Sequence, residues 1–172
     1  MDTPLTRSAT FLVLSVTDPK ESIQTIRSAL AGISSLIKNV AIRDPSSSLS
    51  CTVGIGSNIW DRLICLPRPA QLHVFLEIRG SIHTAVSTPG ELLLHIRSEH
   101  RDICFEFERQ LKDLLSGSVT VIDETVGFRY FDIRDLLRFV DGTLNPVGSA
   151  IPASVLVADE DNSGVGGSYI VV

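Results

Sequence analysis

The stretch ATFLVLSVTDPKES, residues 9–22, decides the fold, because it holds a strand, a helix start and a sharp boundary between them. Residues 9–16 are a short apolar run rich in residues that favour strands. Asp18, Pro19 and Glu21 then supply a capping carboxylate, a proline in the first helical turn and an acidic residue at the third position. The sequence therefore predicts a strand that passes directly into a helix.

The helix that begins there is predicted to extend for several turns. Its apolar side chains recur at alternating intervals of three and four residues, which is the period of a helix with one buried face. Gly32 lies inside this pattern and weakens the helix by roughly 1 kcal/mol relative to alanine. The predicted buried face consists of Ile23, Ile26, Leu30, Ile33 and Ile37.

Further along the chain, the pattern predicts three more strands and a second long helix. The strands are expected at 48–56, 91–98 and 118–131, and a short helical turn is expected at 57–63. The second long helix starts near Ser98 and ends at Gly117. Its predicted buried face consists of Ile103, Phe107, Leu111 and Leu114. The segment 72–79 alternates like a strand but lies between loop signals, so its structure is left open.

The order strand, helix, strand, strand, helix, strand predicts an α+β fold of the ferredoxin-like type, an antiparallel sheet with both helices packed on one face. We expect this unit to span residues 7–131. Residues 132–165 then form a loop and linker. The final run, 166–172, is predicted to begin a strand, and a strand needs a partner for its backbone groups. We therefore expect it to open a second, incomplete ferredoxin-like domain.

Composition and charge narrow the function classes. The chain has 172 residues, enough for one domain with a sizeable core. A net charge of -5 offers no basic field for nucleic acid or for an anionic membrane surface, so neither partner is expected. The apolar run near the N-terminus is too short for a signal core or a membrane span. The simplest expectation is a cytoplasmic protein.

The titratable residues predict no metal site within the chain. Cys51, Cys65 and Cys104 form no CxxC pair, and we expect reduced, mostly buried thiols. The segment 159–164 matches only the first half of a calcium loop and is expected to be a solvated turn. The acidic pairs Glu106 with Glu108 and Asp132 with Asp135 have spacings common on any exposed surface, and no role is assigned to them.

The segment RFVDGTLNP, residues 138–146, contains Asp-Gly and Asn-Pro, which are turn dipeptides when taken alone. Its wider setting, VGFRYFDIRDLLRFVDGTLNP, resembles the segment that marks dye-decolourising (Dyp-type) peroxidases, a family of haem enzymes with two ferredoxin-like domains. Residues 87–111 resemble the strand and helix that precede this motif in the family, and 166–172 resemble the first strand of its second domain. The likeness extends from about residue 9 to the end of the chain.

The resemblance implies a haem-dependent peroxidase with heme b as its cofactor. Asp141 matches the acid on the distal side of the haem, where one carboxylate can take a proton from one peroxide oxygen and return it to the other. Gly142 would let the backbone approach the porphyrin. The other cofactor-binding residues implied are Phe139 and Val140, which would anchor the loop by apolar packing, and Thr143 and Asn145, which would bond its main chain.

Two motif positions depart from the family pattern. Arg138 stands where the motif has its first glycine, and a side chain there costs roughly 1–2 kcal/mol if the position requires a positive φ. Leu144 stands where an acid is usual before Asn-Pro. The resemblance places the histidine that ligates iron beyond Val172, in the missing C-terminal domain, so no metal ligand is expected here.

Two interpretations remain open. In the first, the chain is the N-terminal part of a peroxidase that uses hydrogen peroxide to oxidise a small aromatic reductant, completed by a C-terminal domain. In the second, it is a non-catalytic ferredoxin-like module for self-association or ligand binding. The sequence leaves the oligomeric state open, and a homo-oligomer is compatible with either interpretation.

Overall fold

A computed structural model of the chain describes residues 5–158 and 163–172. Its elements are β1 (Ser8–Val16), α1 (Pro19–Ala41), the 3₁₀ turn η1 (Pro45–Ser47), β2 (Ser50–Ile55), α2 (Ser57–Leu63), β3 (Ile78–Arg79), β4 (Thr84–Ala85), β5 (Leu92–Ser98), α3 (Arg101–Leu114), β6 (Val119–Phe128) and α4 (Ala150–Val155).

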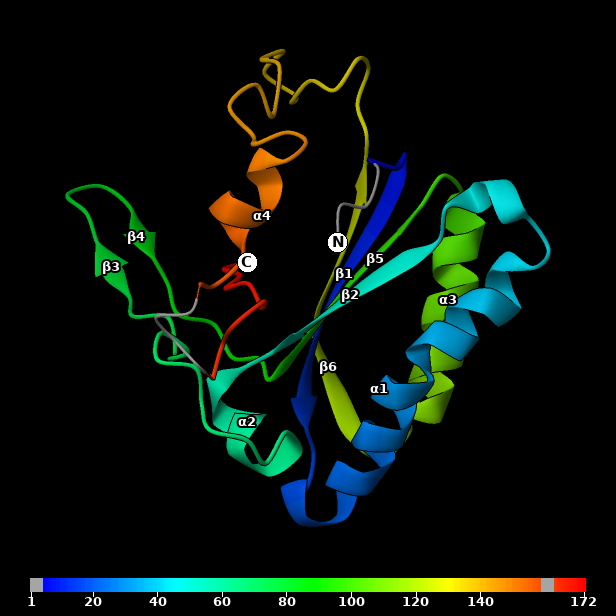
Figure 1. Ribbon diagram of the computed structural model, residues 1–172, viewed down its shortest axis with the longest axis vertical. Coiled ribbons are helices and arrows are strands. Elements are labelled where there is room, and N and C mark those ends of the chain that lie inside the picture. The colour runs from blue at the N-terminus through cyan, green and yellow to red at the C-terminus, as the bar shows by residue number, and fades with distance from the viewer. Residues whose placement is uncertain (1–4, 159–162) are drawn as a thin grey trace.

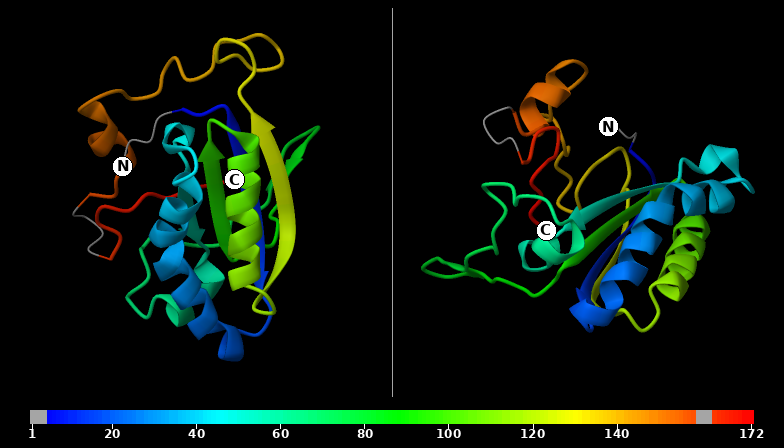
Figure 2. Two further views of the ribbon diagram at one scale, coloured as in Figure 1. Left: turned by 90° about the vertical axis from the view of Figure 1, so that its right-hand side faces the viewer. Right: turned by 60° about the horizontal axis from the view of Figure 1, so that its bottom comes forward.

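The main sheet has four strands in the order β2-β5-β1-β6, and each neighbouring pair is antiparallel. Helices α1 and α3 lie side by side on one face of this sheet (Figures 1 and 2). The first strand, β1, lies inside the sheet, and the last strand, β6, pairs with it at the edge. The predicted α+β, ferredoxin-like arrangement is therefore confirmed.

The boundary predicted between the first strand and the first helix is also confirmed. The Asp18 side chain accepts a hydrogen bond from the backbone N–H of Lys20 at 2.8 Å, and Pro19 opens α1. The buried face of α1 is rotated slightly from the predicted one, so only some of the predicted side chains lie in the core. Ile26 and Ile33 lie in the core, whereas the remaining predicted side chains, Ile23, Leu30 and Ile37, are only partly buried beside it. Three further residues of α1 are buried, namely Ala29, Leu36 and Val40.

Helix α3 shows a similar one-residue difference at its end. Phe107 and Leu111 are fully buried as predicted. Leu114 is 51% exposed, so its predicted place in the core is wrong, and Leu115 is buried in its stead. Leu115 follows the last residue of the helix, where the chain turns back toward the sheet before Gly117, which adopts a φ of 77°.

The segment left open by the sequence, 72–79, lies in an exposed arm. Only Ile78–Arg79 and Thr84–Ala85 pair there, as a two-stranded hairpin separate from the main sheet. Figure 1 shows this hairpin, β3 and β4, projecting from the body of the molecule. Ile78 and Ile82 on it are exposed, so the apolar alternation in this segment does not reflect burial within the chain.

The C-terminal part of the chain differs from its prediction. Strand β6 ends at Phe128, and residues 168–172 belong to neither sheet of the described structure. A strand exists only through hydrogen bonds to a neighbour, and here the preceding residues bond locally: Val157 N–H donates to the Gly167 carbonyl at 2.9 Å and Gly166 N–H donates to the Val157 carbonyl at 3.1 Å. The boundaries 132–165 and 166–172 stay predictions. None of the described helices has the length and hydropathy to cross a membrane.

Candidate active-site loop

The predicted site residues lie on one loop between β6 and α4 (Figure 1). The loop leaves the sheet at Arg129, whose N–H donates to the Arg7 carbonyl at 2.9 Å and so extends the pairing of β6 with β1 by one bond. Arg134 then forms isolated bridges with both Tyr130 and Val140. The chain therefore folds back on itself directly before Asp141.

Backbone hydrogen bonds fix where Asp141 sits. Its N–H donates to the Ile133 carbonyl at 3.1 Å, which connects the acid to the part of the loop that precedes the turn. On the far side, Asn145 N–H donates to the Gly142 carbonyl at 3.0 Å and closes a turn around residues 142–145. Asp141 is held between these two closures, with its side chain exposed.

The tight turn before Asp141 is organised by Asp135. Arg138 N–H donates to the Asp135 main-chain carbonyl, and Asp135 N–H donates to the Phe139 carbonyl, both at 3.0 Å. The Asp135 carboxylate also accepts the Phe139 N–H at 2.9 Å. In addition, the guanidinium of Arg134 donates to the Arg138 carbonyl at 3.0 Å. Both acidic and basic side chains thus bond the main chain of the turn.

Positive φ angles cluster on this loop. Phe131, Ile133 and Arg138 have φ values of 41°, 61° and 75°, and Gly142 has 74°. A residue with a Cβ pays roughly 1–2 kcal/mol for this region, and a β-branched residue such as Ile133 is an outlier there. The motif position held by Arg138 does have the left-handed conformation that favours glycine. The loop therefore stores strain that its hydrogen bonds must offset.

The Asn145 side chain lies beside Gly142. A Cβ built on Gly142 would lie 2.9 Å from the Asn145 side-chain nitrogen, so the end of that side chain would have to move. The bond that closes this turn comes from the main chain of Asn145. The predicted roles of the Thr143 and Asn145 side chains in bonding the loop stay predictions.

The apolar residues of the loop are not packed against the rest of the described chain. Phe139 is 69% exposed and Val140 is 48% exposed, so the apolar packing expected to anchor them is not supplied within this structure. No element of the described chain covers this side of the loop closely enough to bury it. Their apolar surface is available to a ligand or to further protein.

The histidines and thiols lie elsewhere. His95, on β5, stacks on Phe11 with ring centroids 4.2 Å apart, and burial followed by the nearby Arg97 charge lowers its pKa. His100, which directly precedes α3, lies 3.3 Å from a carboxylate oxygen of Asp44. In the part of the chain that the structure describes, no three His, Cys, Asp or Glu side chains gather as a metal site, and residues 159–162 of the candidate calcium turn lie outside that part.

The three cysteines are free, but the expectation of mostly buried thiols is only partly right. Burial raises the pKa of Cys51 to about 12 and that of Cys104 to about 11. Cys65 is exposed. It lies just after α2 and has a φ of 58°. An Arg27 guanidinium nitrogen lies 2.8 Å from its sulfur.

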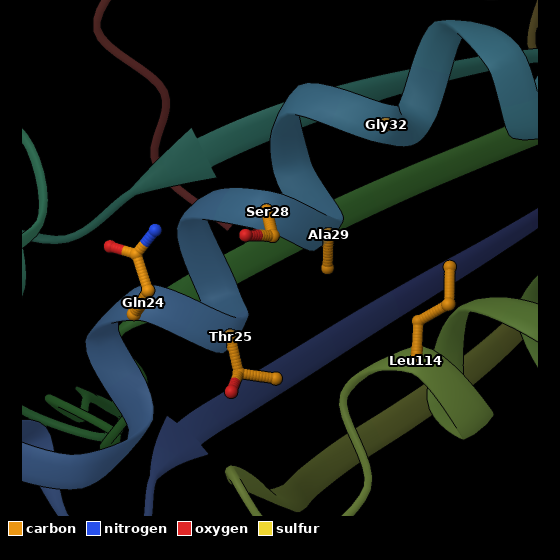
Figure 3. Close-up of a pocket in the computed structure, with 6 residues that line it drawn as sticks. All are labelled: Gln24, Thr25, Ser28, Ala29, Gly32 and Leu114. Carbon is orange, nitrogen blue, oxygen red and sulfur yellow. The ribbon is translucent and has the colours of Figure 1, made fainter.

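A shallow groove of about 450 Å³ lies between α1 and α3 (Figure 3). Its lining contains no charged side chain and is made of Gln24, Thr25, Ser28, Ala29, Gly32 and Leu114. Figure 3 shows Leu114 reaching across from α3 toward Ala29. The groove holds no titratable group and lies on the helical layer, apart from the Asp141 loop, so it does not suggest chemistry.

Sequence reasoning missed two acids. Asp135 was given no role, yet it bonds the turn before Asp141. Glu108, also given none, is 5% exposed and forms an ion pair with Lys112, which in turn lies 2.7 Å from Glu124 on β6. This hydrogen bond from Lys112 lowers the pKa of the Glu124 carboxyl. A signal was present for Glu108, because it follows the buried Phe107 and precedes Lys112 by one helical turn.

Two family models match the chain in succession. The model for the N-terminal domain of Dyp-type peroxidases matches residues 2–129, which is the ferredoxin-like unit, and the model for the C-terminal domain of the same enzymes matches residues 132–172. The chain belongs to the Dyp-type peroxidase family. Because the second model matches from residue 132, the C-terminal domain expected to be missing is not wholly absent from this chain.

Individual relatives agree with the family models. A dye-decolorizing peroxidase of Mycolicibacterium paratuberculosis is 50% identical, over 98% of this chain and 47% of its own length. A DypB variant of Rhodococcus jostii RHA1, solved in complex with heme, is 44% identical, with a TM-score of 0.88 over 95% of this chain and 53% of that one. The encapsulated DyP-type peroxidase of Mycobacterium smegmatis is 47% identical, with a TM-score of 0.88 over 95% and 52%. The chain spans about half the length of the curated relatives it matches.

Proposed function

We propose that this chain provides the distal half of a haem peroxidase of the dye-decolourising type, with Asp141 as its proton-transferring residue. The single observation that carries the proposal is the strained loop that presents Asp141. Its backbone is held by hydrogen bonds on both sides of the acid, while positive φ angles are maintained at Ile133 and Arg138. Such strain tends to persist at functional sites, where the surrounding bonds over-determine it.

The described residues fit one face of a flat, largely apolar cofactor. The loop exposes an apolar surface made of Leu136, Leu137, Phe139, Val140 and Leu144. Gly142 has no side chain, which by the family resemblance would let its backbone approach the porphyrin. The residue that ligates the haem iron would come from the remainder of the C-terminal domain. The loop would therefore cover the haem from the distal side while another part of the protein holds the iron.

The chain's own contribution to the reaction is proton transfer and exclusion of water. Bound haem would supply the redox chemistry, in which hydrogen peroxide is reduced and a small aromatic reductant is oxidised in one-electron steps. The Asp141 carboxylate would accept the proton from one peroxide oxygen and donate it to the other, which requires one group within reach of both. Phe139 and Val140 would exclude water from this exchange once the cofactor covers them.

The partners we propose follow from this assignment. They are hydrogen peroxide, a small aromatic reductant and the remainder of the C-terminal domain, and we place the protein in the cytoplasm. A homo-oligomer is compatible with the exposed apolar surface. Relatives solved with heme and a relative solved as an encapsulated protein support the cofactor and a larger assembly.

The second candidate function is a non-catalytic module for self-association. The observation that favours it is the projecting β3–β4 arm, whose exposed apolar side chains include Ile78, Ile82 and Val86. An isolated two-stranded hairpin is marginally stable in water, so a protein contact would stabilise it. Self-association without haem binding by the completed protein would favour this candidate.

The test is titration of the purified chain with haemin, alone and with a supplied second domain, followed by hydrogen peroxide and a dye. We expect a Soret shift only for the completed protein. Asp141→Ala should slow its peroxide reaction by roughly 10²–10⁴-fold, the usual contribution of a positioned acid-base group. Asp132→Ala is the matched control, since Asp132 is an exposed acid of the same loop. Unslowed peroxide reduction in Asp141→Ala would refute the assignment.

A further inference from the structure

The Asp135 carboxylate and the Arg134 guanidinium both bond the main chain of the turn before Asp141, and we infer that Asp135 is a positioning residue for Asp141. The inference rests on the proposed function for its consequence in catalysis, while its structural part concerns this loop alone. Asp135 is half-buried, whereas Leu136, Leu137 and Arg138 after it are exposed. It is therefore the inward-facing member of the turn.

The hydrogen bonds made by Asp135 connect it to both residues that precede Val140. Its main chain accepts the Arg138 N–H and donates to the Phe139 carbonyl, and its side chain accepts the Phe139 N–H. Three bonds from one residue fix the direction in which the chain leaves the turn. A hydrogen bond to a charged group contributes more than a neutral one, so the side-chain bond is the strongest of the three.

The Asp135 side chain also offsets strain, together with the Arg134 guanidinium, which donates to the carbonyl of the same peptide. Arg138 is forced into the left-handed region with a φ of 75°, and without compensation the chain would relax toward a conformation that a residue with a Cβ prefers. Such relaxation would rotate the peptide that follows Arg138, which carries the Phe139 N–H. Because the Asp135 carboxylate binds that N–H, it resists the rotation directly.

Asp141 follows this turn by two residues, so the direction of the chain after the turn determines where Asp141 lies. The bridge between Arg134 and Val140 and the bond from Asp141 N–H to the Ile133 carbonyl both require the turn to bring the two arms together. Losing the turn would therefore release Asp141 from Ile133. Asp135 itself has no part in the chemistry, since its carboxylate is engaged with the main chain.

Three variants of the 172-residue chain test the inference without haem. Asp135→Ala removes the acceptor, Asp135→Asn keeps an oxygen acceptor at the same place, and Asp132→Ala removes a neighbouring acid that accepts no hydrogen bond within the described residues. Amide hydrogen exchange measured by NMR reports on the N–H groups of Phe139 and Asp141. We expect Asp135→Ala to speed the exchange of both amides at least roughly tenfold, the lower end of the effect of losing a hydrogen bond to a charged group.

The controls separate positioning from general damage. Asp135→Asn should restore most of the protection, Asp132→Ala should leave it unchanged, and the amides of β1 and β5 should exchange alike in all three variants. If Asp135→Ala leaves the Asp141 amide as protected as in the parent chain, the inference is wrong. Equal loss of protection in Asp132→Ala would also overturn it.

The catalytic consequence is tested in the completed protein. Asp135→Ala should slow the peroxide step and change its pH profile, because a misplaced Asp141 transfers protons less efficiently, and Asp135→Asn should recover both. If the completed protein does not bind haem, the proposed function fails while the exchange result still decides whether Asp135 holds the loop. If haem binds and peroxide reacts normally in Asp135→Ala, only the positioning role fails.

Discussion

The ferredoxin-like unit and the Asp141 loop are stabilised in opposite ways. Every buried hydrophobic side chain of the described structure lies between Leu12 and Leu115, and none of the described residues after Ser118 is buried. The unit is held by apolar contacts between the sheet and two helices. The loop is held by backbone and side-chain hydrogen bonds, with its apolar residues exposed. A difference of this kind predicts that the two regions respond to different substitutions and open independently.

The largest effect is expected in the core. Phe107→Ala removes a ring that is 0% exposed on α3 and should lower the free energy of unfolding by about 3–5 kcal/mol, through lost burial and the cavity left behind. Phe105→Ala is the matched control on the same helix, since Phe105 is 65% exposed. Its effect should stay within about 0.5 kcal/mol. Urea unfolding followed by circular dichroism measures both, and equal shifts would contradict the burial described for α3.

The next effect should be confined to the loop. Gly142→Ala places a Cβ at a φ of 74° and within 2.9 Å of the Asn145 side chain. We expect a local cost of about 1–2 kcal/mol, seen as faster amide exchange at Asn145, whose N–H closes this turn. The urea midpoint of the whole chain should not move. A lower midpoint would show that the loop unfolds together with the core, and the contrast between the two regions would then be lost.

Arg138→Gly should act in the opposite direction on the same loop. Glycine tolerates a φ of 75°, so the strain of roughly 1–2 kcal/mol is relieved, although glycine also gains freedom when the loop opens. The net gain should be about 1 kcal/mol or less, measured as slower exchange of the Phe139 and Asp141 amides. Arg129→Gly is the control, because Arg129 has no positive φ. Slower exchange in both variants would mean that side-chain charge, and not backbone strain, is responsible.

The same contrast explains what the sequence could and could not predict. The start of α1 and the elements of the sheet follow from apolar period and capping residues, which act locally, so Asp18 and Pro19 indicated the boundary correctly. The limits of the core were harder to place, since Leu114 and Leu115 are both apolar and only the turn of the chain decides which is buried. Ile78 and Ile82 show that an apolar pattern alone does not establish burial.

The loop was predictable only in part. The role of Asp141 followed from a motif and stays a prediction. The motif raised the question of a positive φ at Arg138 without deciding it, and the structure shows a φ of 75° there. Nothing in the local pattern distinguished Asp135 from Asp132, because both are acids in a polar run. Their difference arises when the chain folds back and brings the Phe139 N–H to one of them. Strand formation at 168–172 depends on a neighbouring strand that this chain does not provide among its described residues.

The smallest effect is expected at His95, which alternates along β5 with the buried Leu94 and Ile96 and so lies on the face of the sheet away from the helices. Burial and the Arg97 charge lower the pKa of His95 in the folded chain, so the unfolded chain binds more protons as the pH falls below the ordinary histidine value of about 6.5. The stability contributed by neutral His95 is therefore complete above that pH and is lost as acid is added. We expect the urea midpoint to fall between about pH 7 and 5. His95→Gln should reduce that slope even though it also loses the stacking on Phe11, whereas His83→Gln, on the exposed hairpin, should keep it. If the urea midpoint of His95→Gln fell with pH as steeply as that of the parent chain, another group would be responsible for the pH dependence.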